Sequence, residues 1–421
     1  MSNKIAVIGL GYVGLPLAIE FGKIIDTVGF DIDTSRITQL QNGIDNTFEV
    51  DSNELSRVKK LKYTSNKNEI SNCDIYIITV PTPVDENKQP DLSLIKEISK
   101  TVGKLLSIND LVIYESTVFP GATEEICVPI LEKYSGFKYN QDFFCGYSPE
   151  RVNPGDKKHR INRVVKVTSG STPQTATKVD NLYKKIIDAG THKVSSIKVA
   201  EAAKIIENTQ RDLNIALVNE FAIIFDKLGI DTEEILEAAE TKWNFLPFRP
   251  GLVGGHCIGV DPYYLAYKSN KVGYQPELIM AGRKINDNMG SFVVKKIINL
   301  MSKKNILLNN ANILIMGLAF KEDCTDIRNT RVIDIYSEFK DLSCNVDIFD
   351  PLVNPSAASK EYGVSIISEP KQANYDVVIL AVAHKVFKKI SVDKINSFGK
   401  SNFVLFDIKY LINKELADGR L

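Results

Sequence analysis

A cysteine, Cys257, lies in the stretch GLVGGHCIGVDP among four glycines, four residues before an acid. Glycines leave a thiol uncovered, and Arg249 in the preceding FRPG adds a cation that would favour the reactive thiolate. Most free cysteines instead act as small buried hydrophobes. Both readings, nucleophile and core filler, stay open on these residues alone.

Three glycines, Gly9, Gly11 and Gly14, form GLGYVG directly after an apolar run and open a helical pattern. In a dinucleotide-binding turn the first glycine allows the tight turn, the second admits the pyrophosphate to the backbone, and the third lets helix and strand pack. Asp31 ends the next strand, where an acid binds the ribose hydroxyls and repels a 2′-phosphate. We predict NAD rather than NADP, although an arginine such as Arg36 can serve either cofactor.

A nicotinamide cofactor combined with a nucleophilic thiol indicates a specific chemistry. Hydride removal from a primary alcohol gives an aldehyde, and thiol attack on that aldehyde gives a thiohemiacetal. A second hydride removal gives a thioester, which water hydrolyses to a carboxylate. One site would then carry out a four-electron oxidation, whereas without the thiol the reaction stops at the aldehyde.

This chemistry needs a group that stabilises an oxyanion and a group that manages protons through water. Lys204 and Asn208 are four apart on one face of a predicted helix and suit the first task, or they belong to a solvated face. Asp261 would orient a water or organise a turn. Glu150 is a candidate base at a strand end, or a cap. His256 adjoins the thiol, but adjacent side chains in an extended loop diverge, so we do not assign it as the base.

The order of strand and helix patterns around these residues predicts an α/β protein. It has two Rossmann-like, doubly wound domains joined by a long central helix. Strand and helix patterns alternate over residues 1–194, which we interpret as an NAD-binding domain. Residues 195–228 have helical periodicity without glycine or proline, and they begin a central helical region, 195–300, that includes the cysteine loop. Such a helix is typical of a spine between domains or a dimer seam. Alternation returns over residues 301–421.

The first turn of this last region, MGLAFKEDCTDIRNTR, differs from the N-terminal turn. It keeps one glycine, Gly317, and adds Lys321, Arg328 and Arg331. The glycines that would admit a pyrophosphate are missing, so we expect this half to bind something other than a dinucleotide.

Composition narrows the class of protein. A chain of 421 residues predicts two or three domains. Lysine plus arginine and aspartate plus glutamate each total 52, so no bulk charge points to nucleic acid or an anionic membrane. The six scattered cysteines predict neither a disulfide framework nor a metal site, and no apolar run is long enough to span a membrane. We expect a cytoplasmic protein.

Seven motifs in order resemble the UDP-glucose/GDP-mannose dehydrogenase family along essentially the whole chain. They are IAVIGLGYVGLPLA, VPTP, ESTVFPGATEE, YSPERVNPGD, KVAEAAKIIENTQRDLNIALVNE, FRPGLVGGHCIGVDPYYL and GLAFKEDCTDIRNT. The resemblance implies an N-terminal NAD domain, a central dimerisation region, a C-terminal domain for the UDP group, and a homo-oligomer that is at least a dimer. It is closest to the branch that oxidises UDP-N-acetylhexosamines for surface polysaccharides.

The resemblance also implies roles for single residues. Cys257 matches the thioester-forming nucleophile, Lys204 and Asn208 the oxyanion pair, Asp261 the acid that orders water, Glu150 the base for hydrolysis and Thr117 the threonine near the catalytic water. The cofactor set is Gly9, Gly11, Gly14, Asp31, Arg36, Thr82, Thr117 and Arg328. The nucleotide-sugar set is Arg151, Phe248, Arg249, Gly251 and Lys321.

One departure bears on the sugar. Enzymes for UDP-glucose commonly read PEFLREG or PEFLAEG where this chain reads PERVNPG, which loses an acid and gains Arg151. This favours UDP-GalNAc or UDP-GlcNAc over the alternatives UDP-ManNAc and UDP-glucose. Two other readings remain: a two-electron hydroxyacid dehydrogenase with a structural Cys257, and a nucleotide-binding protein without turnover.

Overall fold

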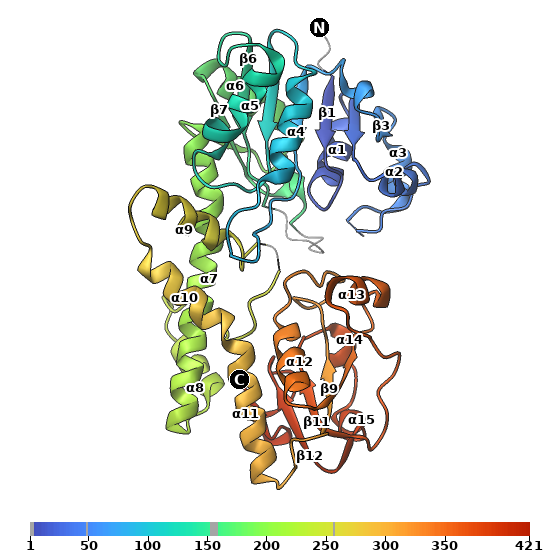
Figure 1. The fold of residues 1–421 in the computed structure, drawn as a ribbon, viewed down its shortest axis with the longest axis vertical. Helices are drawn as coiled ribbons and strands as arrows, with labels where there is room; N and C mark the ends of the chain where they lie inside the picture. The colour runs from blue at the N-terminus through green and yellow to red at the C-terminus, as the bar shows by residue number, and fades with distance from the viewer. Residues whose placement is uncertain (1–3, 48, 152–158, 256) are drawn as a thin grey trace. The chain divides into compact units, whose positions relative to one another are not determined.

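The computed structural model describes residues 4–47, 49–151, 159–255 and 257–421. It divides into two compact units, one of residues 1–207 and 263–275 and the other of residues 208–262 and 276–421. Figure 1 shows an α/β arrangement with one sheet in each unit. The predicted fold class is confirmed.

The first unit contains an eight-stranded sheet with the order β3-β2-β1-β4-β5-β6-β7-β8. Its central strands are continuous apolar runs such as IAVI in β1, fully buried, because helices cover both faces of a parallel sheet. The strands are β1 (Ile5–Ile8), β2 (Thr27–Phe30), β3 (Leu61–Thr64), β4 (Ile75–Ile78), β5 (Asp110–Tyr114), β6 (Phe143–Tyr147), β7 (Lys166–Gly170) and β8 (Thr191–Lys193). The helices are α1 (Gly14–Gly22), α2 (Thr34–Gln41), α3 (Ser52–Arg57), α4 (Ser93–Gly103), α5 (Val128–Ser135) and α6 (Pro173–Tyr183).

Strands β7 and β8 run opposite to the other six strands of this sheet. Strand β7 pairs antiparallel with β6, whereas the other neighbouring pairs of this sheet are parallel. A parallel return needs a crossover of a dozen or more residues, usually a helix. Between these strands the described residues form only a short 3₁₀ turn, Ile161–Arg163. The chain therefore folds back beside β6.

The central region is helical. Helix α7 (Ile197–Leu228) confirms the long helix predicted for residues 195–228, and Gly229 ends it with a φ of 69°. The helices that follow are α8 (Thr232–Glu240), α9 (Asp261–Lys271), α10 (Glu277–Asp287) and α11 (Met289–Lys303). Among the described residues, no helix has the length and apolar character that a membrane crossing requires.

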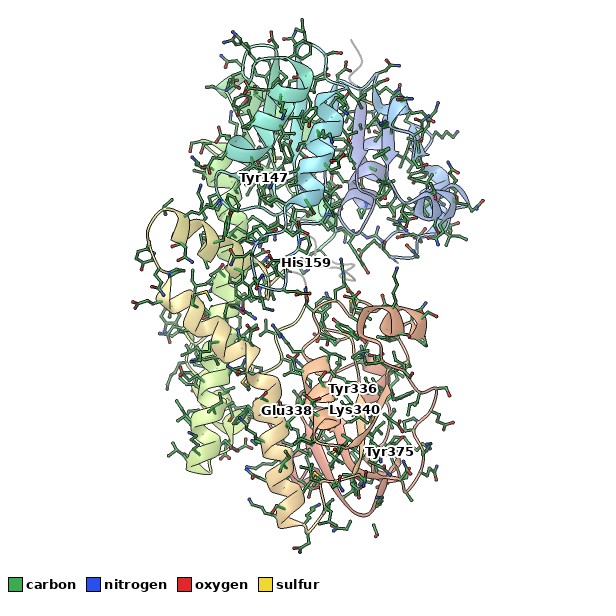
Figure 2. The ribbon with its side chains drawn as sticks, in the orientation of Figure 1. Tyr147, His159, Tyr336, Glu338, Lys340 and Tyr375 are labelled. Carbon is green, nitrogen blue, oxygen red and sulfur yellow. The ribbon has the colours of Figure 1, made fainter. Side chains whose placement is uncertain are left out.

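The second sheet is parallel, with the order β10-β9-β11-β12-β13. Its strands are β9 (Asn312–Met316), β10 (Asn345–Phe349), β11 (Tyr375–Leu380), β12 (Gly399–Asp407) and β13 (Gly419–Arg420). Helices α12 (Val332–Asp341), α13 (Pro355–Tyr362), α14 (Lys385–Lys388) and α15 (Val392–Asn396) connect them. Each core contains a buried tyrosine whose hydroxyl is bonded: Tyr147 donates to Ser116 O at 3.1 Å and Tyr375 to Asp347 Oδ2 at 2.9 Å (Figure 2).

Candidate functional site

The glycine turn after β1 has the geometry that the sequence predicts for each glycine. Gly9 has a φ of 95°, which other residues rarely adopt. A Cβ on Gly14 would lie 1.8 Å from the carbonyl oxygen of Gly9, so only glycine lets α1 start so close to β1. A Cβ on Gly11 would meet no protein atom within 4 Å. The backbone at Gly11 is therefore open, which fits the approach of a pyrophosphate.

Asp31 lies directly after β2 and is tied to the glycine turn. Its Oδ2 accepts a hydrogen bond from Leu10 N at 2.8 Å, and its side chain is half-buried. Arg36 is buried beneath the same turn, where its Nε donates to Leu10 O at 3.0 Å and its guanidinium pairs with Asp45 at 2.8 Å. The side chain of Arg36 thus supports the turn through its carbonyl.

Threonines follow strands β4 and β5 at the same edge of the sheet. Thr82, after β4, donates from Oγ1 to Thr117 O, after β5, at 2.5 Å. Tyr264 of α9 donates to Thr82 O at 2.8 Å. The carboxyl ends of β1, β2, β4 and β5 therefore gather the glycine turn, Asp31, Thr82 and Thr117, at the edge where doubly wound sheets bind ligands.

Glu150 follows β6 and belongs to a buried cluster that sequence reasoning missed. Lys166 Nζ lies 2.6 Å from Glu150 Oε2 and 2.9 Å from Glu115 Oε2, and Tyr183 donates its hydroxyl hydrogen to Glu115. Burial raises the pKa of Glu115 although Lys166 opposes the shift. Burial by itself would lower the pKa of Lys166, but Glu115 and Glu150 outweigh it and raise that pKa. No spacing signal links these residues, because the pairs are up to 68 positions apart.

Cys257 is half-buried and precedes the first turn of α9, whereas the other five cysteines are buried. Its carbonyl accepts hydrogen bonds from Val260 N at 3.1 Å and Asp261 N at 2.9 Å. All six cysteines are free thiols. Cys257 is therefore more exposed than the other five cysteines, and its role as the nucleophile stays a prediction.

Asp261, the first residue of α9, is 1% exposed, and its Oδ2 accepts a hydrogen bond from Asn208 Nδ2 at 2.6 Å. Asn208 and Lys204 lie one turn apart on α7 and are 4% and 6% exposed. The alternative of a solvated lysine and asparagine face is thus wrong. Two groups predicted for one site, Asn208 and Asp261, are in direct contact.

The double glycine before Cys257 allows a close approach by the segment after β9. A Cβ on Gly254 would lie 2.8 Å from Asn329 O, and one on Gly255 would lie 2.8 Å from the Phe320 ring. Gly255 also has a φ of 81°. These glycines therefore seat the loop against residues 320–330. His256 and residues 152–155 of PERVNPG lie outside the described residues.

Besides Arg36, three arginines of the predicted site carry ion pairs. Arg249 pairs with Glu233 at 2.8 Å and with Glu240, so the structure engages this cation with two carboxylates. Arg151 pairs with Glu207 and donates to Lys204 O at 3.3 Å. Arg328 forms a fork with Asp326.

The remaining predicted substrate residues are placed as follows. Phe248 and Lys321 are half-buried, and Lys321 Nζ lies 5.6 Å from the centre of the Phe320 ring. Gly251 is buried and bonded to Asn219 through both its N–H and its carbonyl. In the part of the chain that the structure describes, no group of three or more His, Cys, Asp or Glu side chains is arranged to hold a metal ion.

Comparison with known proteins covers the whole chain. Residues 3–187 match the NAD binding domain of the UDP-glucose/GDP-mannose dehydrogenase family, residues 198–288 its central domain and residues 314–414 its UDP binding domain. The UDP-N-acetyl-D-glucosamine 6-dehydrogenases of Pseudomonas aeruginosa and Salmonella typhi are each 58% identical over 418 residues, which cover 99% of this chain and 99% and 98% of those proteins.

A solved structure of a related enzyme has the same fold. A UDP-D-ManNAc dehydrogenase from Pyrococcus horikoshii matches with a TM-score of 0.88 at 30% identity, and the match covers 98% of this chain and 96% of that one. The matched segments include the glycine turn, the cysteine loop and the turn after β9.

Proposed function

Since the chain belongs to the UDP-glucose/GDP-mannose dehydrogenase family and is an NAD-dependent nucleotide-sugar dehydrogenase, we propose that it oxidises C6 of UDP-N-acetyl-D-glucosamine to the uronic acid. The observation that carries the choice of sugar is 58% identity, over 99% of the chain, to two enzymes named for that substrate. UDP-GalNAc is the neighbouring candidate, and UDP-ManNAc and UDP-glucose are the alternatives. A product of this kind is a charged precursor for a surface polysaccharide.

Cys257 is the proposed nucleophile, because it is the half-buried thiol of the set and lies in the glycine loop. Its sulfur would add to the C6 aldehyde, and the thiohemiacetal would be oxidised to a thioester. Water then releases the carboxylate and regenerates the thiol. The balance is RCH₂OH + 2 NAD⁺ + H₂O → RCOO⁻ + 2 NADH + 3 H⁺.

Asn208 and Lys204 are the proposed donors to the oxyanion at C6. Asp261 accepts from Asn208, which fixes the orientation of that amide, and it would also order water. Glu150 is the proposed base for hydrolysis, and Thr117 would help to hold the water. Burial supports these roles, since a hydrogen bond to a developing charge is stronger away from solvent.

The open backbone at Gly11, the close packing at Gly14 and the carboxylate of Asp31 fit NAD. We propose that Gly9, Arg36, Thr82, Thr117 and Arg328 complete this site. When bound, NAD accepts the hydride from C6.

The nucleotide sugar is assigned to Arg151, Phe248, Arg249, Gly251 and Lys321. This assignment goes with the proposed division into an NAD domain (1–194), a central region (195–300) and a C-terminal domain for the UDP group (301–421). We propose a cytoplasmic location, because six free thiols suit a reducing compartment.

Helix α7 supports a homodimer. Five exposed apolar residues lie along one line of the helix, since the last four come 7, 18, 25 and 29 residues after the first and so point within about 20° of its direction. They are Val199, Ile206, Leu217, Ile224 and Leu228. A second copy of this chain would bury this stripe, so Ile206→Glu combined with Leu217→Glu should convert a dimer to a monomer in light scattering.

The test of the reaction is the number of NADH formed per sugar. Purified protein with excess NAD should give two NADH and a carboxylate from UDP-GlcNAc, and Cys257→Ser should release no uronate. One NADH per sugar, or uronate from Cys257→Ser at the native rate, would exclude the thioester route. Turnover of another UDP-sugar alone would replace the substrate, and no turnover would favour the binding protein.

A further inference from the structure

The loop that carries Cys257 is hydrogen-bonded to α7 at its start, Gly251, and at its end, Asp261. At the start, Gly251 N donates to Asn219 Oδ1 at 2.8 Å, and Asn219 Nδ2 donates to Gly251 O at 3.1 Å. At the other end, Asn208 donates to Asp261. Asn208 and Asn219 are eleven residues apart, about three helical turns, so both project from one face of α7.

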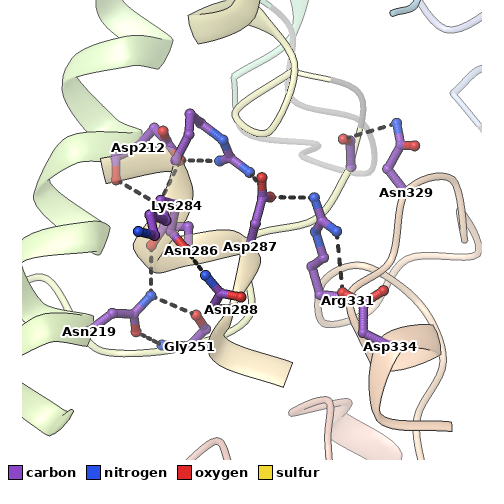
Figure 3. A network of polar contacts seen from close by, with 12 residues as sticks. Asp212, Asn219, Gly251, Lys284, Asn286, Asp287, Asn288, Asn329, Arg331 and Asp334 are labelled. Atoms are coloured by element: carbon purple, nitrogen blue, oxygen red, sulfur yellow. Dashed lines mark hydrogen bonds and ion pairs between the residues drawn. The ribbon is translucent and has the colours of Figure 1, made fainter. Parts of the chain in front are cut away.

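Asn219 is fully buried and is itself held by a polar network (Figure 3). Its Nδ2 also donates to Asn286 Oδ1 at 2.8 Å, and Asn286 Nδ2 donates to Asp212 Oδ1 at 2.7 Å. Arg283, 1% exposed, donates to Asp212 at 2.5 Å. With one amide hydrogen of Asn219 on Asn286 and its oxygen on Gly251, the orientation of the amide is determined.

The network also extends to the segment after β9. Asp287 accepts hydrogen bonds from both Arg283 and Arg331. A Cβ on Gly259 would lie 4.0 Å from Arg283 Nη2, which places this guanidinium next to the loop that carries Cys257. Charged and amide groups therefore connect helices α7 and α10, the loop and residues near 331.

The composition of the loop explains why such fastening matters. Four of the eleven residues from Gly251 to Asp261 are glycines, which have the largest conformational freedom when unfixed. The hydrogen bonds from Asn219 restrict the backbone at the first of these glycines. A displacement of about 1 Å of a reacting group costs on the order of 100-fold in rate.

We infer that Asn219, held by Asn286, is a positioning residue that sets the location of the Cys257 thiol by clamping the backbone of Gly251. The inference rests on the proposed function, in which Cys257 is the nucleophile. Asn219 would affect the rate of the covalent steps and leave the binding of NAD unchanged, because its partners, Gly251 and Asn286, are not among the residues proposed to bind NAD.

The experiment compares Asn219→Ala with Asn214→Ala in the full-length protein. Asn214 is a matched control on the same helix, whose side chain donates to Gln210 O at 2.9 Å. We expect Asn219→Ala to accelerate hydrogen exchange in the peptide spanning 251–261 and to lower kcat at least 10-fold, with KM for NAD within twofold of wild type. Asn214→Ala should match wild type in all three.

The outcomes separate the two proposals. Exchange in residues 251–261 that Asn219→Ala leaves unchanged, or faster exchange with a native kcat, would overturn the inference. Wild-type protein that forms no NADH from any UDP-sugar would overturn the proposed function, while the exchange result would still test the clamp. If Asn219→Ala does not fold, Asn286→Ala is the second variant, since it removes only the side chain that accepts from Asn219. It should accelerate hydrogen exchange and lower kcat in the same way, but by less.

Discussion

The turns after β1 and β9 share one backbone design and differ in what they do with it. Gly9 and Gly317 have φ values of 95° and 100°. Their N–H groups donate to Phe30 O and Phe349 O at 2.8 and 2.9 Å. The next residue, a leucine in both turns, donates to an aspartate, Asp31 at 2.8 Å or Asp350 at 2.7 Å. Two halves of the chain therefore build the same strand-turn geometry.

The two turns diverge after the leucine. Helix α1 begins at Gly14, whereas α12 begins only at Val332. Asp31 is half-buried, but Asp350 is 2% exposed and also accepts from Ala319 N at 3.1 Å and pairs with His384 at 3.1 Å. Asp323 N donates to His384 Nδ1, so Nε2 of that ring carries the hydrogen that Asp350 accepts. The first acid is available to a ligand, and the second is used within its own domain.

The largest effect should come from Gly14→Val. The new side chain would clash with the Gly9 carbonyl, so the turn opens and NAD affinity should fall at least about 100-fold in calorimetry. Gly11→Ala is the control, because its methyl meets no protein atom and should preserve the melting temperature while it weakens NAD binding. If Gly14→Val bound NAD with native affinity, the turn after β1 would not be the NAD-binding turn.

Exchanging the two acids for alanine should give opposite results. Asp350→Ala leaves four donors without their acceptor and should lower the free energy of unfolding by about 2–4 kcal/mol with NAD binding intact. Asp31→Ala should weaken NAD about 10-fold and reduce discrimination against NADP. Urea unfolding measures the change in stability, and cofactor titration measures the change in NAD affinity. If the two variants weakened NAD binding equally, the two acids would not differ in role.

The smallest effect is a pH dependence that belongs to Asp350. Burial would raise its pKa, but hydrogen bonds from His384 and from Leu318 N outweigh burial and lower it. A lowered folded pKa contributes stability above the ordinary carboxyl pKa near 4, and this stability is lost as the pH falls through the folded pKa. The melting temperature should therefore fall less steeply between pH 6 and pH 3 for Asp350→Asn than for wild type. Parallel curves would contradict this assignment.

Local patterns predicted much of this molecule. The family resemblance, the α/β class and NAD are confirmed, and Gly9, Gly11 and Gly14 have the geometry expected of them. These signals are readable because each lies within one strand, turn or helix. Only the folded chain reveals the Lys166 cluster, the bond of His384 to Asp350 and the bond of Asn219 to Gly251, because these contacts join residues 16 to 68 positions apart.

The register of α7 between Asn208 and Asn219 has an evolutionary consequence. One inserted or deleted residue in this stretch would rotate one asparagine by about 100° relative to the other and shift it by about 1.5 Å. The loop would then lose one of its two attachments, and the apolar stripe on the opposite face would be broken at the same point. Substitutions can accumulate here as the lineage diverges, but the length of this stretch should stay constant.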